Sequence, residues 1–136
     1  MNKKRIKVSL VDDDAGTREN LKTILNASAT LACLHTYGSG EEAVREIPVN
    51  PPDVVLMDIN LPGISGIEAM RILHADPVTA HIPIIAISAN AVPRDIEKAL
   101  AAGFFSYLTK PIKVSQFMDA RDVALDFAQT PAGRAA

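Results

Sequence analysis

Polar side chains that can do chemistry stand directly after four apolar runs of strand length. Carboxylates held close together repel one another unless a cation joins them, and a hard divalent ion such as Mg²⁺ (or Mn²⁺) takes oxygen ligands of this kind. A carboxylate can also attack phosphorus and form an acyl phosphate, whose charged oxygens need a cation and a hydroxyl donor. The residues concerned are Asp12, Asp13 and Asp14 after the first run, Asp58 after the third, Ser88 after the fourth, and Thr109 and Lys110 after the fifth.

Each of these residues, taken alone, has an ordinary structural explanation. An aspartate after a strand often caps the next helix, and Asp14 is placed to do so. A lysine before a proline, as at Lys110, is typical of a surface position, and Ser88 alone indicates nothing. The chemical interpretation therefore depends on whether the fold brings these residues together.

Apolar runs of strand length alternate with helical patterns along the chain, which predicts an α/β fold. The runs are nearly continuous in Val, Ile and Leu, as expected of parallel strands covered on both faces. Ligands of such sheets bind beyond the carboxyl ends of the strands, so the polar residues above are predicted to converge on one edge. The predicted strands are Ile6–Val11, Leu31–Tyr37, Val54–Met57, Ile84–Ile87 and Phe104–Leu108; the predicted helices are Thr17–Ala27, Ser39–Glu46, Ile67–Ala75, a segment starting at Pro93 and ended by Gly103, and Val114–Ala128.

Length and composition predict one domain of ordinary globular type. The chain has 136 residues, of which 48% are hydrophobic and 22% charged. Residues 1–128 are predicted to form the domain and residues 129–136 a flexible tail, with no output domain. A single cysteine, Cys33, rules out an internal disulfide and is interpreted as a small core residue.

The charge pattern argues against binding to nucleic acid or membranes. The formal net charge of -2 gives no general attraction to nucleic acid. Four basic residues between Lys3 and Lys7 are interpreted as a solvated lead-in to the first strand; the alternative, a nucleic-acid-binding arm, lacks interleaved aromatic residues. No signal peptide or membrane-length apolar run is present, which predicts a cytoplasmic protein.

Four segments resemble the signature blocks of response-regulator receiver domains, the CheY-like domains of two-component signalling systems. They are Val11-Asp12-Asp13, Val54 to Gly63 (VVLMDINLPG), Ala86-Ile87-Ser88-Ala89 and Tyr107-Leu108-Thr109-Lys110-Pro111, in the family's order within residues 5–128. The resemblance implies a flavodoxin-like, doubly wound five-stranded parallel sheet in the order 2-1-3-4-5 with five helices.

The resemblance also implies a role for each site residue. It implies a phosphoacceptor, a phosphate-binding cation, a Mg²⁺ (or Mn²⁺) site and a pair of residues that switch conformation. By position, these are Asp58 as phosphoacceptor; Lys110 and Ser88 as partners of the phosphoryl group; Asp13, Asp58 and the backbone carbonyl of Asn60 as metal ligands, with Asp12 acting through water; Ser88 and Tyr107 as the switch; and a cis peptide bond at Lys110–Pro111.

The function that follows from the resemblance is phosphotransfer signalling rather than conventional enzyme catalysis. Asp58 would accept a phosphoryl group from the phosphohistidine of a sensor histidine kinase or a histidine phosphotransfer protein. Ser88 and Tyr107 would then rearrange, and the surface of the fourth helix, fifth strand and fifth helix would bind a downstream protein. No direct nucleic acid or membrane binding is implied, and the protein would be a monomer or a phosphorylation-dependent dimer.

Two other classes of function stay open. The same fold could be an unphosphorylated interaction module, although every expected site residue is present. A nucleotide or flavin binder would need a phosphate-cradling loop after the first strand, where Asp12 to Asp14 would repel phosphate. His35, His74 and His81 show no metal-ligand spacing and are interpreted as surface or core-edge residues. Whether the chain acts alone or as part of a larger regulator is also left open.

Overall fold

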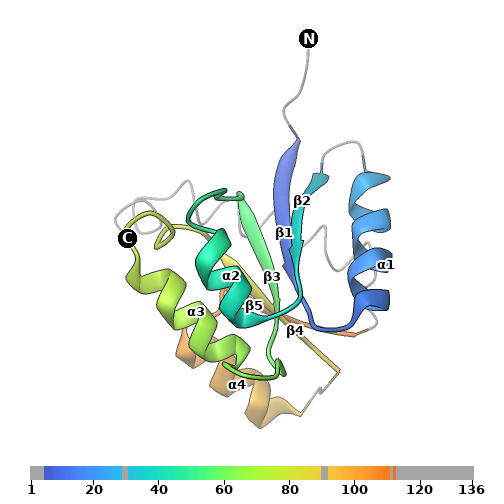
Figure 1. The fold of residues 1–136 in the computed structure, drawn as a ribbon. Helices are drawn as coiled ribbons and strands as arrows, with labels where there is room; N and C mark the ends of the chain where they lie inside the picture. Colours follow the sequence, from blue (N-terminus) through green and yellow to red (C-terminus); the bar gives the residue numbers. More distant parts are fainter. Residues whose placement is uncertain (1–4, 29–30, 90–91, 111, 113–136) are drawn as a thin grey trace.

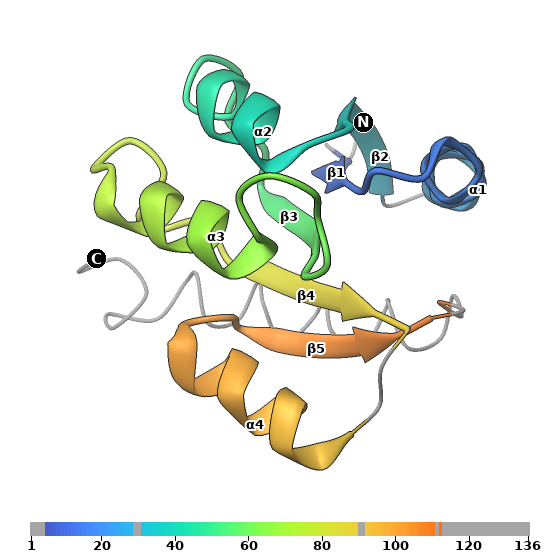
Figure 2. The same ribbon diagram turned by 60° about the horizontal axis from the view of Figure 1, so that its bottom comes forward.

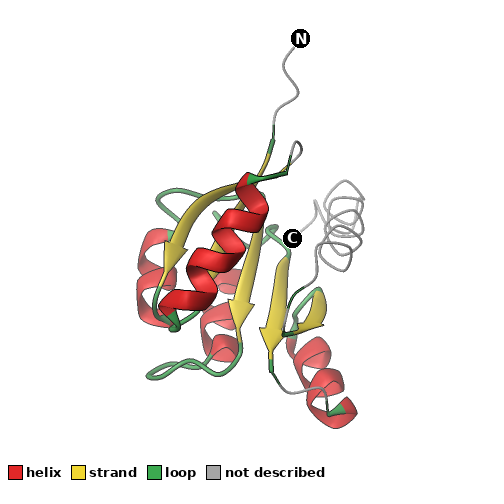
Figure 3. Cartoon of the chain, turned by 90° about the vertical axis from the view of Figure 1, so that its right-hand side faces the viewer, coloured by secondary structure: helices red, strands yellow, loops and turns green. Residues whose placement is uncertain are grey.

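Five strands of largely buried aliphatic residues form a single parallel sheet in the computed structural model, which describes residues 5–28, 31–89, 92–110 and 112 (Figure 1). The strand order is β2-β1-β3-β4-β5, and every neighbouring pair is parallel. Figure 3 shows the strands, in yellow, with helices, in red, on both faces of the sheet. The predicted flavodoxin-like α/β fold and its strand order are confirmed. The strands are β1 (Ile6–Val11), β2 (Leu31–Tyr37), β3 (Val54–Asp58), β4 (Ile84–Ser88) and β5 (Ser106–Thr109).

Four helices lie within the described residues, and local sequence explains where each begins. Asp14, Ser39 and Ser65 cap three of them, because each side chain accepts a hydrogen bond from a backbone N–H in the first turn. The fourth starts at Pro93, which has no N–H to leave unpaired. The helices are α1 (Ala15–Asn26), α2 (Gly40–Glu46), α3 (Gly66–Ala75) and α4 (Pro93–Ala102). The predicted helix Val114–Ala128 and the predicted tail lie outside the described residues.

Two strand boundaries differ from the prediction in a way that matters for the site. β3 and β4 are each one residue longer, because Asp58 pairs with Ile87 and Ser88 pairs with Thr109. Both polar residues are therefore part of the sheet. In contrast, β5 begins two residues later than predicted, since the N–H of Phe104 bonds the carbonyl of Ala99 and belongs to the turn that ends α4.

The sheet separates two apolar layers. On one face α1 packs against the strands through Leu21 and Leu25, and on the other α2, α3 and α4 cover them (Figure 1). Successive strand residues alternate between the layers, so Val55 and Met57 face α2 to α4 while Leu56 faces α1. Both layers bury aliphatic side chains, which explains the continuous apolar runs.

Cys33 lies at the edge of the α1 layer and is partly buried. Burial raises the pKa of its thiol, which disfavours the reactive thiolate. This agrees with its interpretation as a small packing residue. Within the described part of the chain, none of the helices is long and apolar enough to cross a membrane.

Candidate functional site

The site lies where the carboxyl ends of β1, β3, β4 and β5 meet. Because all strands run the same way, the residues that end or follow them share one edge of the sheet (Figure 2). Asp12 follows β1, Asp58 ends β3, Ser88 ends β4 and Lys110 follows β5. Backbone hydrogen bonding between β4 and β5 extends to these residues, since the Lys110 N–H donates to the Ser88 carbonyl at 2.8 Å. The predicted convergence on one edge is confirmed for these four residues.

Three carboxylates form a cluster that fits a hard divalent cation. Asp12, Asp13 and Asp58 each present an oxygen within 4.8 Å of the others. Asp12 is fully buried and Asp58 is 4% exposed, whereas Asp13 is exposed. The buried Oδ2 of Asp12 lies 2.8 Å from the ammonium of Lys110. An all-oxygen cluster open on the Asp13 side suits Mg²⁺ with retained waters.

Lys110 carries the positive charge of the cluster. Its Nζ lies 2.8 Å from Asp12 Oδ2 and 3.3 Å from Asp58 Oδ2, so one ammonium forms ion pairs with both buried carboxylates. Partial burial by itself disfavours the charged form, but Asp12 and Asp58 outweigh it and raise the pKa of Lys110. Three carboxylates against one ammonium leave the cluster negative, which favours a further cation.

Asp58 is a buried carboxylate with defined partners. Burial raises the pKa of its carboxyl, while the Asn60 N–H and Lys110 limit the rise. The Asn60 N–H donates to Asp58 Oδ1 at 3.0 Å and Lys110 donates to Oδ2 at 3.3 Å. The carboxylate is thus held in one orientation at the mouth of the site.

Ser88 and Tyr107 line the same small cavity. This cavity, of about 210 Å³, opens beside Asn60 and is bounded by Asp95 and Lys98 of α4. Tyr107 is half-buried against the α2-to-α4 layer. The Asn60 side-chain amide donates to the Ser88 hydroxyl at 3.2 Å. The two predicted switch residues therefore lie next to the loop that follows Asp58 and to α4.

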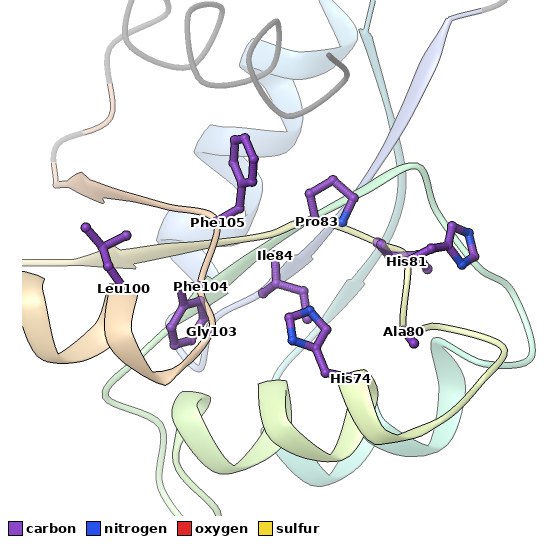
Figure 4. Close-up of a pocket in the computed structure, with 10 residues that line it drawn as sticks. His74, Ala80, His81, Pro83, Ile84, Leu100, Gly103, Phe104 and Phe105 are labelled. Carbon is purple, nitrogen blue, oxygen red and sulfur yellow. The ribbon is translucent and has the colours of Figure 1, made fainter. Parts of the chain in front are cut away.

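A larger hollow lies at the other end of the sheet. It measures about 530 Å³. Its lining includes His74 of α3, Leu100 of α4 and Phe104 of the turn before β5 (Figure 4). His81 points away from the hollow in this view. Its described lining is mainly apolar and contains no carboxylate, so it lacks the oxygen ligands and the aspartate found at the acidic edge.

Two contacts at the site could not be predicted from the sequence. Arg18 of α1 donates from Nη1 to the backbone carbonyl of Asp12 at 2.7 Å, and the Asn60 side chain reaches Ser88 across 28 residues of sequence. An arginine in an amphipathic helix and an asparagine in a loop are common, so neither stands out. Asp14 is the cap of α1, as its structural interpretation predicted. The proposed metal-binding carbonyl of Asn60 stays a prediction, and the Lys110–Pro111 peptide lies outside the described residues.

The sequence profile of the response regulator receiver domain family matches residues 8–122. The chain therefore belongs to this family, whose members are signalling domains of two-component systems rather than conventional enzymes. The polar-differentiation response regulator DivK of Brucella ovis is 35% identical over 112 residues, which cover 82% of this chain and 89% of DivK.

A second curated relative is larger. The protein-glutamate methylesterase/protein-glutamine glutaminase 1 of Syntrophus aciditrophicus is 37% identical over 119 residues, or 85% of this chain. The chain spans about a third (33%) of that protein. The likeness therefore supports the receiver assignment and does not extend to the esterase activity.

A solved structure resembles the fold closely. The receiver domain of the sensor histidine kinase PA1611 of Pseudomonas aeruginosa PAO1 superposes with a TM-score of 0.77 at 27% identity, covering 93% of this chain and all (100%) of that one. That structure has a magnesium ion coordinated in its active site cleft. The acidic cluster described above gives this chain the oxygen ligands for such an ion.

Proposed function

We propose that this chain is a phosphorylation-activated receiver in which Asp58 accepts a phosphoryl group from a phosphohistidine of a sensor histidine kinase or a histidine phosphotransfer protein. The observation that carries the proposal is the position of Asp58, a buried carboxylate that shares Lys110 with Asp12 and lies within 4.8 Å of the other two acids. Family membership supports the same reaction.

In the proposed reaction, a carboxylate oxygen of Asp58 attacks the phosphorus of the phosphohistidine. A P–O bond forms and the P–N bond breaks; the imidazole nitrogen keeps the electron pair and takes up a proton. Lys110 faces the reacting carboxylate and stabilises negative charge on the transferred group. Mg²⁺, held by Asp13, Asp58 and the Asn60 carbonyl with Asp12 acting through water, would neutralise charge on the phosphoryl oxygens.

The proposed response to phosphorylation involves Ser88 and Tyr107. The phosphoryl group carries about −1.5 to −2 charges at neutral pH. The Ser88 hydroxyl, whose oxygen accepts from the Asn60 amide, would donate its own proton to a charged phosphoryl oxygen. Movement of Ser88 would open space for Tyr107, because both residues line one cavity that α4 closes. The fourth helix, fifth strand and fifth helix would then bind a downstream protein. We further propose that the receiver is cytoplasmic and a monomer, or a dimer once phosphorylated.

The test of the phosphoacceptor is Asp58→Asn. This change removes the nucleophilic carboxylate and keeps its shape, so labelling by acetyl phosphate in Mg²⁺ should be abolished. Intact-mass spectrometry measures the added phosphoryl group directly. The matched control is Asp53→Asn, an exposed carboxylate at the opposite end of the same strand region, which should label like the wild type. Labelling of Asp58→Asn at the wild-type stoichiometry would exclude Asp58 as the acceptor.

A further inference from the structure

Asp12, the first residue after β1, forms polar contacts through its N–H, its carboxylate and its backbone carbonyl. Its N–H donates to the Tyr37 carbonyl of β2 at 3.0 Å, and its Oδ1 accepts from the Asp14 N–H at 2.9 Å. Its Oδ2 forms the ion pair with Lys110. Its backbone carbonyl accepts from Nη1 of Arg18, a side chain of α1, at 2.7 Å.

The carbonyl of Asp12 needs such a donor because the sheet no longer supplies one. The pairing of β1 with β3 ends at Val11 and Met57, one residue earlier. Asp12 is nevertheless fully buried, and a buried backbone carbonyl without a partner is strongly disfavoured. A guanidinium offers charged donors in a rigid plane, which makes a short and well-directed bond to a carbonyl.

The surrounding chain leaves room for this guanidinium. A Cβ at Gly38, which follows β2, would lie 3.4 Å from Arg18 Nη1, so any longer side chain there would compete for the same space. The Gly38 N–H is itself held by Glu42 of α2 at 2.9 Å. Arg18 therefore lies between the loop that follows β1 and the loop that follows β2.

We propose that Arg18 is a positioning residue for the cation site. By fixing the Asp12 carbonyl, it sets the peptide that joins Asp12 to Asp13 and thereby the directions in which both carboxylates point. No described contact joins Arg18 to a carboxylate of the cluster, so it acts through backbone geometry. The proposal rests on the cation-dependent function proposed above. Groups that orient metal ligands commonly change metal affinity by about 10- to 100-fold when removed.

The experiment is a Mg²⁺ titration followed by backbone amide NMR shifts in the wild type, Arg18→Met, Arg18→Lys and Arg45→Met. Methionine keeps much of the apolar stem and loses the donor, so the Kd for Mg²⁺ should rise by about 10-fold or more. Lysine keeps one donor and should give an intermediate Kd. Arg45 is an exposed arginine of α2, and its substitution removes the same charge without reaching Asp12, so the Kd should stay near the wild-type value.

Labelling by acetyl phosphate separates positioning from direct chemistry. At saturating Mg²⁺, Arg18→Met should label to the wild-type extent, because Asp58 and Lys110 are unchanged. A Kd in both Arg18 variants equal to that of Arg45→Met would overturn the proposal, and Arg18→Lys keeps this comparison available if Arg18→Met does not fold. If the wild type itself shows no Mg²⁺-dependent shifts at the site, the proposed function fails instead.

Discussion

At the scale of single residues, Lys110 is the positive charge that Asp12 and Asp58 share. It forms ion pairs with two carboxylates that would otherwise repel each other, one of them fully buried. Its contribution to phosphotransfer itself is expected to be smaller than its contribution to the response, because the cation-binding carboxylates and Asp58 remain when it is removed. Lys110 links β5 to the phosphoacceptor, and β5 carries Tyr107.

We therefore expect Lys110→Ala to accept a phosphoryl group while its conformational response weakens. Intact-mass spectrometry after acetyl phosphate treatment measures the labelling, and the NMR signals of Tyr107 report the response. The control is Lys22→Ala on α1, which removes the positive charge of an exposed side chain that lines neither the cavity of Ser88 and Tyr107 nor the acidic cluster. A Tyr107 response in Lys110→Ala equal to that of the wild type would contradict this role.

Asn60 illustrates how one residue can serve two neighbours. Its N–H donates to the Asp58 carboxylate and its side-chain amide donates to the Ser88 hydroxyl. The proposed phosphoacceptor and the proposed switch hydroxyl are therefore joined through a single loop residue in the unphosphorylated chain.

At the scale of secondary-structure elements, the first residue of α3 determines how closely that helix approaches Asp58. Gly66, its first residue, donates its N–H to the Ile59 carbonyl at 3.0 Å. A Cβ at this position would collide with the backbone carbonyl of Asp58 and the Cα of Ile59. Ser65 and Glu68 complete a capping box that begins the helix there. The glycine is thus required by the close approach of α3 to the end of β3.

We expect Gly66→Ala to lower the free energy of unfolding by about 1–3 kcal/mol, the usual cost of overpacking. Urea unfolding measures this change. The matched control is Gly16→Ala in the first turn of α1, where a Cβ meets only the Asp14 side chain at 3.5 Å. That substitution should raise stability by about 0.5 kcal/mol, because alanine loses less conformational entropy in a helix. Equal effects of the two substitutions would refute the close-approach explanation.

His74 lies in the last turn of α3 and is partly buried. Burial lowers the pKa of its imidazole below 6.5, against a smaller opposite effect from its hydrogen bond with the Ile82 backbone. As the pH falls, the unfolded chain therefore takes up this proton before the folded chain does. Its contribution to stability is present above the unfolded pKa and is lost as the pH falls through the folded pKa.

We expect His74→Gln to flatten the loss of stability as the pH falls below about 6.5, since the proton uptake by the unfolded chain is removed. Urea unfolding at several pH values measures the slope for the wild type, His74→Gln and the control His81→Gln, which alters an exposed histidine. The prediction is wrong if the His74→Gln and wild-type slopes coincide.

At the scale of the whole molecule, we expect the acidic edge to couple cation binding to folding. Asp12 and Asp58 are buried with one shared lysine, and Asp13 adds a third carboxylate. A ligand that binds only the folded state stabilises it by RT ln(1 + [L]/Kd), about 2.7 kcal/mol at 100 times the Kd. Mg²⁺ is expected to act in this way because the unfolded chain does not bring the three acids together.

We expect saturating Mg²⁺ to raise the Tm of the wild type and to raise that of Asp13→Asn much less. Differential scanning calorimetry measures the Tm, and a sodium salt at equal ionic strength separates binding from screening. An equal rise in both proteins would show that Mg²⁺ acts elsewhere on the molecule.

The sequence by itself determined the order of elements and the composition of the site. Apolar runs predicted the five strands. Caps such as Asp14 and Ser39 are hydrogen bonds between residues three apart, so they can be predicted from the sequence. Parallel strands place the residues that follow them on one edge, which was enough to predict that Asp12, Asp58 and Lys110 would meet.

Only the tertiary structure decided the contacts that join distant residues of ordinary type. The Lys110 ion pairs depend on β1, β3 and β5 ending at the same level, the Asn60 side chain reaches Ser88 only once β3 and β4 pair, and Arg18 reaches the Asp12 carbonyl only once α1 packs back on the sheet. The tertiary structure also decided where two strands end, because Asp58 and Ser88 are part of the sheet only through their pairing with the neighbouring strands. These contacts depend on three-dimensional proximity, and no spacing along the chain encodes it.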